Sequence, residues 1–424
     1  MNALNEYLDS RTDETIKTLD ELVRIPTQVP PGENYEKIMN YMAQRLEDLD
    51  FQVEKLVMPR ELFVKKNPRM AHLTGERVNL SAIKDAGKEK TLLINTHLDV
   101  VPADSNWSVP PFECTIKEGR IFGRGVADSK GGVAALLTVL SAMKELEIEQ
   151  GYNLNIAMTT DEEMGPYSGL CYLADLGKLK ADFFLSMDGD SDDITTASNG
   201  NADWQIDVLG KSYHSGSSFL GVNAIEKTIP VMNGLMELKK KIEKRRSKVP
   251  SSMAISQKTG IKTLMPVLNI TLINGGVKQN IVPDRCTMKG DRRYIPEEKF
   301  EDVCKEMNDA IAMVREKHPD IDLKISCDDV YAPMLTDMNH PWIKEVKKMA
   351  EITAGKEIRL VGAQGSLDVA YAVRVTGLPA CCFGTGRRTE SNAHAGDENI
   401  LIEDLVMYTK FLGKLICGAN NLSE

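Results

Sequence analysis

The stretch TLLINTHLDVVP (residues 91–102) is a short, mostly apolar run that ends in polar residues. Two similar runs follow, LNIAMTT (154–160) and DFFLSMD (182–188), and Gly, Pro or Asp bounds each of them. Between the first two lies GGVAALLTVLSAMKEL (131–146), which has the length and the apolar face of a helix. Strands that alternate with helices form βαβ units, so we predict an α/β fold with a mostly parallel central sheet flanked by helices.

The pattern changes from about residue 199. ADWQIDVLG (202–210) and LNITLING (268–275) alternate as half-exposed strands do, and two amphipathic stretches (223–246 and 297–317) predict helices. With the strands CTMKGDRRY and DLKIS, the order becomes strand, helix, strand, strand, helix, strand. That order is typical of an α+β, ferredoxin-like unit.

We therefore predict that one domain is interrupted by another. Residues 1–198 and 329–424 would form the two parts of the first domain, because the α/β pattern resumes past Pro341. Residues 199–328 would form the inserted domain. A chain of 424 residues is long enough for two hydrophobic cores.

Composition excludes several classes of partner. A formal net charge of −10 argues against nucleic acid or an anionic membrane. The beginning of the sequence lacks the features of a signal peptide, and the longest apolar stretch, VAALLTVLSAM, is about half the length of a membrane span. Eight scattered cysteines without a CxxC motif predict neither a disulfide framework nor a cysteine zinc site, so we expect a cytoplasmic protein.

Ionisable side chains gather where the three apolar runs end. They are His97 and Asp99 after the first run, Asp161, Glu162 and Glu163 after the second, and Asp188 at the close of the third. Asp128 lies in the Gly-rich turn GRGVADSKGG ahead of the predicted helix. Ligands bind at the carboxyl ends of parallel strands, and several carboxylates with a histidine need a cation between them. The sequence therefore favours a metal site.

Each position taken alone also has an ordinary structural interpretation. A histidine at a strand end is usually a satisfied polar group, an acidic turn is more often a solvated loop, and Asp128 could cap the following helix. The Gly-rich turn lacks the GxxxxGK[ST] order of a phosphate-binding loop. The joint occurrence of these groups at one sheet edge favours the metal interpretation.

Three motifs together resemble a known family. HLDVVPADSNWSVPPFECTIKEGRIFGRGVADSKGG (97–132) contains H-x-D, W-x-x-P-P-F, G-R-G and D-x-K-G elements in order, and TTDEEMG (159–165) and ESNAHAGDENI (390–400) follow. These are similar to the signatures of the co-catalytic zinc amidohydrolases and peptidases. That family includes acetylornithine deacetylase, succinyl-diaminopimelate desuccinylase, aminoacylase and glutamate carboxypeptidase. The resemblance extends from about residue 12 to the end.

The resemblance implies a dinuclear, metal-dependent hydrolase of amide bonds. Zinc is the expected ion, although cobalt or manganese would also accept two histidines with carboxylates. The implied ligands are His97 and Asp188 for one ion, Glu163 and His394 for the other, and Asp128 as the bridge between both. Asp99 would hydrogen-bond the far nitrogen of His97 and fix its tautomer.

The resemblance also implies the groups that act on the substrate. Successive side chains of extended backbone point opposite ways, so Glu162 and Glu163 cannot both face one ion; Glu163 would coordinate and Glu162 would be the general base. The resemblance makes the inserted domain a lid. In this lid, His214 resembles the family's histidine that stabilises the oxyanion, often across a dimer interface. The substrate-binding pair would be Asn280 and Arg293.

Some features differ from the family pattern or leave the assignment open. Arg292 is adjacent to Arg293, so either arginine could meet a substrate carboxylate. The family's usual proline after His214 is missing, and Ser129 stands where Met is common. Asp188 replaces a glutamate, as in the peptidase branch.

We expect an N-acyl-amino-acid deacylase of the acetylornithine or succinyl-diaminopimelate type. A carboxypeptidase or dipeptidase with the same machinery is the alternative, and Asp188 mildly favours it. A binding protein without activity is disfavoured because Glu162 and all five ligand positions are present. The implied partners are a small N-acyl amino acid or short peptide and a second copy of the chain, joined through the lid.

Overall fold

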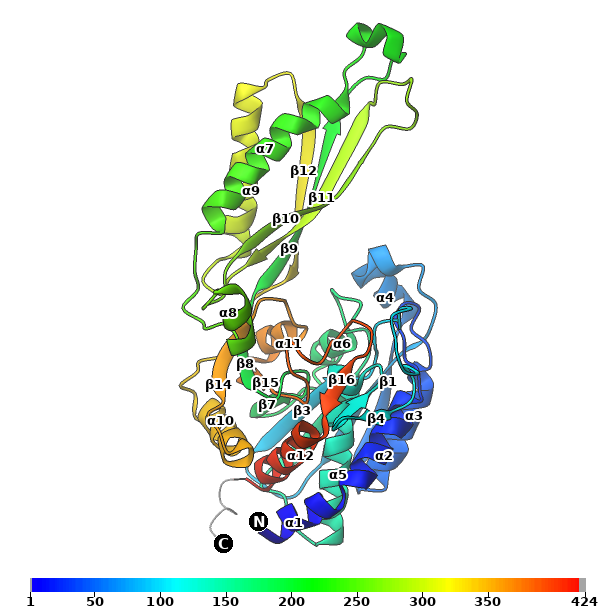
Figure 1. Ribbon diagram of the computed structural model, residues 1–424, viewed down its shortest axis with the longest axis vertical. Coiled ribbons are helices and arrows are strands. Elements are labelled where there is room, and N and C mark those ends of the chain that lie inside the picture. Colours follow the sequence, from blue (N-terminus) through cyan, green and yellow to red (C-terminus); the bar gives the residue numbers. More distant parts are fainter. Residues whose placement is uncertain (1, 419–424) are drawn as a thin grey trace.

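The computed structural model describes residues 2–418, and within them a nine-stranded sheet forms the centre of the molecule (Figure 1). Its order is β1-β2-β6-β3-β7-β15-β8-β13, and β14 pairs with β8 beside this path. These strands are β1 (Gln52–Met58), β2 (Arg77–Lys84), β3 (Thr91–His97), β6 (Asn153–Thr159), β7 (Phe183–Ser186), β8 (Asp193–Ser198), β13 (Met334–Leu335), β14 (Arg359–Ala363) and β15 (Ala380–Cys382).

The strands in the middle of the sheet are parallel, and most outer strands are antiparallel, although β14 pairs in parallel with β8. β3 pairs in parallel with both β6 and β7, and β15 pairs in parallel with β7. β1, β2 and β13 pair with their neighbours in antiparallel fashion. The predicted α/β class with a mostly parallel central sheet is confirmed.

Helices cover both faces of this sheet. Leu92 and Ile94 of β3 belong to one buried cluster and Leu93 to another, as expected for alternate side chains of a strand buried on both sides. The first cluster includes α1 (Asn2–Ser10), α2 (Thr12–Val23), α3 (Tyr35–Glu47), α5 (Gly131–Glu145), α10 (Pro341–Ala354) and α12 (Ile402–Cys417). The second includes α6 (Gly169–Asp175) and α11 (Val369–Thr376).

Helix α5 lies at the centre of the larger cluster. Within residues 2–418, the stretch Val126–Glu145 is the one helical segment that is long and apolar enough to cross a membrane, and 89% of its apolar window is buried inside the fold. It packs mainly on α12 and α2. The apolar character of α5 therefore matches its place as a core helix.

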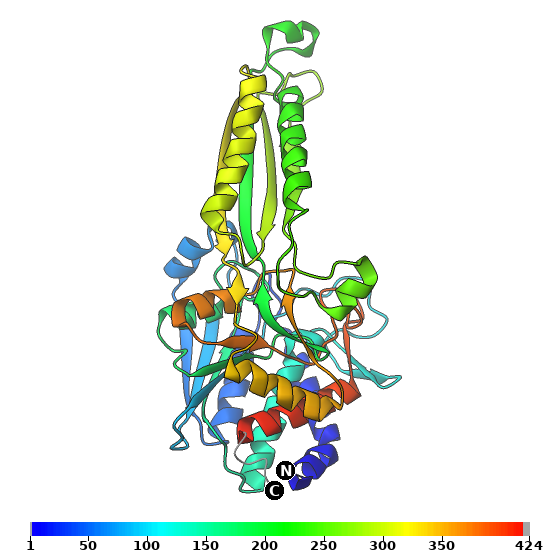
Figure 2. The same ribbon diagram turned by 90° about the vertical axis from the view of Figure 1, so that its left-hand side faces the viewer.

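A second, smaller unit projects from the sheet, as Figures 1 and 2 show. It is an antiparallel sheet of order β10-β11-β9-β12 with two helices on one face. Its elements are β9 (Gly200–Leu209), α7 (Ala224–Ile242), β10 (Val267–Gly275), β11 (Arg285–Tyr294), α9 (Phe300–Lys317) and β12 (Asp322–Tyr331), with α8 (Met253–Thr259) added between α7 and β10. We call this unit the lid; its boundaries as a separate domain, residues 199 and 328, remain a prediction.

Short elements complete the surface near the carboxyl ends of the central strands. The three-stranded sheet β16-β5-β4 consists of β4 (Thr115–Lys117), β5 (Arg120–Phe122) and β16 (Asn399–Leu401). Helix α4 (Arg60–Lys66) and the turn η1 (Pro68–Met70) reach toward the lid (Figure 1).

Replacing a core leucine of α5 should destabilise the whole first domain. Leu137 is fully buried, so Leu137→Ala leaves a cavity and should lower the free energy of unfolding by about 2–5 kcal/mol. Leu146, which is exposed at the end of the same helix, is the control. Leu146→Ala should change the free energy of unfolding by about 0.5 kcal/mol or less. Urea unfolding measures both, and equal effects would contradict the central position of α5.

Candidate metal centre

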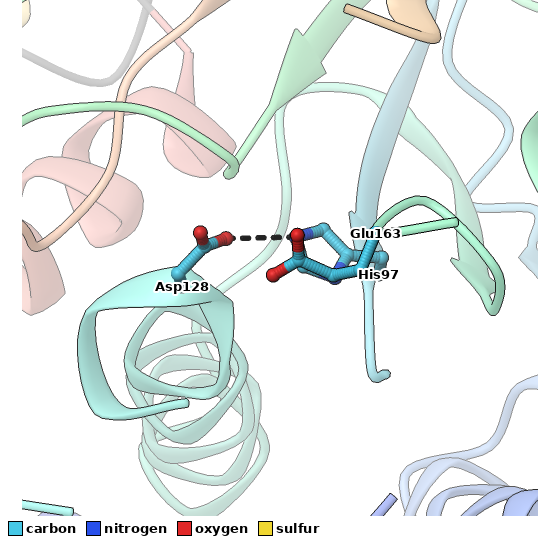
Figure 3. A group of neighbouring side chains, drawn as sticks. All are labelled: His97, Asp128 and Glu163. Carbon is cyan, nitrogen blue, oxygen red and sulfur yellow. Dashed lines mark hydrogen bonds and ion pairs between the residues drawn. The ribbon is translucent and has the colours of Figure 1, made fainter. Parts of the chain in front are cut away.

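Five ionisable side chains from distant parts of the chain meet at the carboxyl edge of the central sheet. His97 is the last residue of β3, and Asp188 lies just beyond β7. Glu163 follows β6, Asp128 lies in the short helical turn η2 (Val126–Lys130), and His394 lies between β15 and β16. Figure 3 shows Asp128 facing His97 and Glu163 across a small gap.

Asp128 lies between the two histidines. Its Oδ1 is 2.9 Å from His97 Nε2, and its Oδ2 is 3.1 Å from His394 Nε2. His394 Nε2 is also 2.8 Å from Glu163 Oε2. One possible ligand atom each from His97, Asp128 and Glu163 lie within 4.8 Å of one another. A carboxylate with one oxygen toward each histidine has the arrangement of a bridge between two cations.

Asp188 lies near Asp128. Both line a cavity of about 120 Å³, together with Asp190 and Arg388. Burial, then the charge of Asp128, raises the pKa of Asp188. The structure thus brings all five predicted ligands to one edge, and their assignment as ligands remains a prediction.

The charged groups of the cluster shift one another's pKa values. Hydrogen bonds to Asp128 and Glu163 raise the pKa of His394 to about 11. Burial, then the charge of Asp128, raises the pKa of Glu163 to about 7. Burial opposes ionisation of Asp128, but hydrogen bonds from His394 and His97 lower its pKa well below the usual range. Two imidazoles and three carboxylates are a donor set that suits two divalent ions.

Asp99 connects the end of β3 to the turn that follows β6. Its backbone oxygen lies 3.0 Å from His97 Nδ1, and its carboxylate Oδ1 lies 3.5 Å from the same nitrogen. The carboxylate accepts hydrogen bonds from the backbone N–H of Glu163 at 3.1 Å and of Glu162 at 3.4 Å. Asp99 therefore orients His97 and also fixes the backbone of the two glutamates.

A buried ion pair holds the first residue of this turn. Asp161 has a φ of 67°, a left-handed conformation, and is fully buried. Tyr35 donates its hydroxyl hydrogen to Asp161 Oδ1 at 2.9 Å, and Arg77 Nε lies 3.1 Å from Oδ2. The sequence pattern indicated the acidic turn but not these partners, because residues 35 and 77 belong to no motif.

Glu162 and Glu163 both line the cleft above the cluster. This cleft of about 820 Å³ lies between the first domain and the lid, and Arg293, Tyr331 and His394 also border it. Burial, then the charge of Asp368, raises the pKa of Glu162 well above the ordinary value. A carboxyl group in this state holds a proton more readily than a solvated one, as a general acid–base group must.

The two adjacent arginines of β11 have different surroundings. Arg293 lines the cleft and donates from Nη1 to Ser366 Oγ at 3.0 Å. Arg292 is only 1% exposed and pairs with Glu298 at 2.9 Å inside the lid. Alternate side chains of a strand point to opposite faces, so only Arg293 is placed to meet a substrate.

His214 and Asn280 lie together at the distal tip of the lid, away from the metal centre. Ser215 N donates to Asn280 O at 3.0 Å, and the turn η3 (Ser215–Leu220) lies at the top of the view in Figure 1. His214 Nδ1 accepts a hydrogen bond from Gly216 N at 3.1 Å. One chain therefore brings neither residue to Glu162.

Comparison with known proteins gives a family match. The model of peptidase family M20/M25/M40 matches residues 93–417. The chain is 26% identical over 430 residues to N-formyl-4-amino-5-aminomethyl-2-methylpyrimidine deformylase of Halalkalibacterium halodurans, covering 96% of this chain and 94% of that one. It is 26% identical over 404 residues to a probable succinyl-diaminopimelate desuccinylase of Staphylococcus epidermidis, covering 91% and 93%.

Solved structures share the fold. An M20 family metallo-carboxypeptidase of Sulfolobus solfataricus superposes with a TM-score of 0.75 at 22% identity, covering 95% of this chain and 98% of that one. Human carnosine dipeptidase 1 superposes with a TM-score of 0.73 at 18% identity, covering 98% of each chain. At these identities the likeness establishes the architecture.

Metal binding should release protons. His394, with a pKa of about 11 in the metal-free site, is protonated at neutral pH, and a cation needs the lone pair that this proton occupies. The apparent affinity for zinc should therefore fall as the pH is lowered from about 8 to about 6. Calorimetry in buffers of different ionisation enthalpy measures the protons released, and an affinity independent of pH would contradict the assignment of His394.

Proposed function

Because the chain belongs to the peptidase family M20/M25/M40, we propose that it removes the acyl group from an N-acylated amino acid with the help of two divalent ions. The chain is a metal-dependent hydrolase of amide bonds. The observation that supports the dinuclear site is the Asp128 carboxylate, which faces His97 with one oxygen and His394 with the other.

The residues around the proposed ions have separate roles. Two ions bound there would polarise the scissile carbonyl and lower the pKa of a water between them. Glu162, on the cleft side of the turn, takes the proton of the attacking water and later delivers it to the departing amine. The raised pKa of Glu162 makes its carboxylate a stronger base for the first step, and the carboxyl group then holds the proton until the amine departs.

Arg293 is the proposed anchor for a carboxylate of the substrate. It lines the same cleft as Glu162, and its guanidinium offers the planar fork that suits a carboxylate. Ser366 accepts a hydrogen bond from Arg293 Nη1 and donates one to Asn199 O at 2.8 Å, which holds the arginine in place. A substrate would thus extend from the metal centre toward the lid.

Two substrate classes fit this cleft. The names of the two sequence relatives, a deformylase and a probable desuccinylase, favour removal of an acyl group. Asp188 in place of glutamate favours a carboxypeptidase or dipeptidase. A release assay over N-formyl, N-acetyl and N-succinyl amino acids and dipeptides, each with zinc, cobalt and manganese, decides between them. Turnover of dipeptides alone would overturn the deacylase proposal.

We also propose that two copies join through their lids, so that His214 reaches the partner's metal centre. Within one chain His214 lies at the lid tip, where large apolar side chains are exposed: Phe219 at 82% and Val277 at 88%. Exposed apolar patches of this kind favour a protein interface. A histidine carried across such an interface would stabilise the oxyanion that forms at the scissile carbonyl.

The identity of the ion and the compartment belong to the same proposal. Histidine and carboxylate ligands suit zinc at such centres. No disulfide bond joins cysteines within residues 2–418, which suits the proposed cytoplasmic location.

Glu162→Gln should abolish turnover without removing the metal. The amide cannot take a proton from water, so kcat should fall by about 10²–10⁴-fold, whereas metal content should stay that of the wild type. Elemental analysis and steady-state kinetics on the same sample measure both. Retained activity would show that another group is the base.

Mixing two inactive variants should restore activity if His214 acts across the interface. A dimer of one Glu162→Gln chain and one His214→Ala chain contains one site with both groups intact. After subunit exchange at equal amounts, about a quarter of the wild-type activity should return, because half of the dimers are mixed. Each variant alone is the control, and exchange without recovery would contradict action of His214 across the interface.

A further inference from the structure

A fully buried ion pair lies beneath the metal centre and contacts neither the cleft nor the predicted substrate groups. Arg124 Nη1 lies 2.7 Å from Glu398 Oε2, and the two side chains are 1% and 0% exposed. Arg124 follows β5 and Glu398 precedes β16, and these strands pair with each other, with Asn399 opposite Phe122. The pair therefore joins two segments more than 270 residues apart.

The Glu398 carboxylate holds the backbone of the loop that ends at Asp128. Its Oε2 accepts the N–H of Gly125 at 2.9 Å. Its Oε1 accepts the N–H of Ala127 at 2.9 Å and of Asp128 at 3.1 Å. Gly125 has a φ of 89°, and a Cβ there would lie 2.7 Å from Val100 Cγ1. The loop therefore needs glycine at this position to follow its path. The backbone N–H of Asp128 is thereby directed down toward Glu398 while its carboxylate faces the histidines.

The same pair also fixes the segment that contains His394. Arg124 Nη2 donates to Ala395 O at 3.1 Å, one residue after His394. Asp397 Oδ1 accepts the N–H of Ser108 at 2.7 Å, and a Cβ on Gly396 would lie 1.9 Å from Asn106 O. The chain from His394 to Glu398 is thus confined on both sides.

A buried ion pair adds little net stability, because the cost of removing two charges from water offsets their attraction. What the pair does supply is geometry: one carboxylate and one guanidinium connect the backbone of Asp128 to the backbone beside His394. An apolar pair of the same volume could fill the space but could not orient these amides and carbonyls.

We propose that Arg124 and Glu398 are positioning residues that set the separation of Asp128 and His394, and so determine the affinity for the ion that His394 and Glu163 hold. The other ion, held by His97 and Asp188, shares only the Asp128 bridge with the pair, and β3 and β7 position its other two ligands, so its affinity depends on the pair less. This inference rests on the proposed dinuclear site.

The test is a zinc titration of metal-free Glu398→Gln against a competing chromophoric chelator. The variant keeps the shape of the side chain but loses the charge that holds Arg124 and three amides. We expect the zinc at His394 and Glu163 to bind about ten- to a hundredfold more weakly, and the zinc at His97 and Asp188 to weaken clearly less. At limiting zinc kcat should fall while KM stays constant.

Arg124→Lys is the second variant, because it keeps the positive charge but lacks the fork that reaches both Glu398 and Ala395. It should weaken binding of the zinc at His394 and Glu163 less than Glu398→Gln does. If Glu398→Gln does not fold, the zinc affinities of Arg124→Lys test the proposal in its place. The loss of zinc-binding free energy in the double variant should be smaller than the sum of the losses in the two single variants, because both substitutions break the same connection.

Arg292→Met is the matched control. Arg292 is equally buried and loses an ion pair of similar length to Glu298, but it lies in the lid. It should lower the melting temperature and leave both zinc affinities unchanged. If the wild type binds no zinc, the proposed function itself fails. If the wild type binds two and folded Glu398→Gln binds both as tightly, only this inference is overturned.

Discussion

An excess of negative charge at one edge of the sheet is the constraint on which the rest of this structure depends. Asp99, Asp128, Glu162, Glu163 and Asp188 lie close together with two histidines, and burial raises the pKa of three of these acids. In water such a cluster would spread apart. Here five segments of backbone keep it together, so the fold places the groups where cations can neutralise them.

The scaffold meets this constraint with buried charges of its own beneath the cluster. Asp161 and Arg77 fix the turn of the two glutamates, and Asp99 ties that turn to β3. Lys130 is fully buried at the far end of the Asp128 loop, where it donates to Leu22 O at 3.1 Å and to Ile25 O at 2.9 Å. Burial lowers the pKa of Lys130 to about 7. Lys130 holds backbone, and Asp99 orients the His97 ring through Nδ1, which leaves His97 Nε2 free to coordinate.

The lid divides the groups of the active site between two places. Arg293 lies at the root of the lid, beside the cleft, because β11 returns toward the first domain at that residue. His214 and Asn280 lie at the tip, at the opposite end of the same sheet. A rigid four-stranded sheet separates these positions within one chain. The proposed assembly of two copies would bring the proposed oxyanion group and the base to one substrate.

The sequence by itself determined the fold class, the order of strands and helices in the lid, the parallel strands β3, β6 and β7, and the residue types at the candidate metal centre, because apolar periodicity and strand-end polarity are local properties. It did not indicate the central-sheet strands β1, β2 and β8. It left open which of Arg292 and Arg293 faces the cleft, and it gave no partners for Asp161, Arg124 or Glu398. Only the tertiary structure decided these points. Side-chain direction depends on the register of β11 in its sheet, and the buried pairs join residues whose distance along the chain carries no signal. Local pattern fixes what each segment is, whereas long-range packing fixes which segments meet.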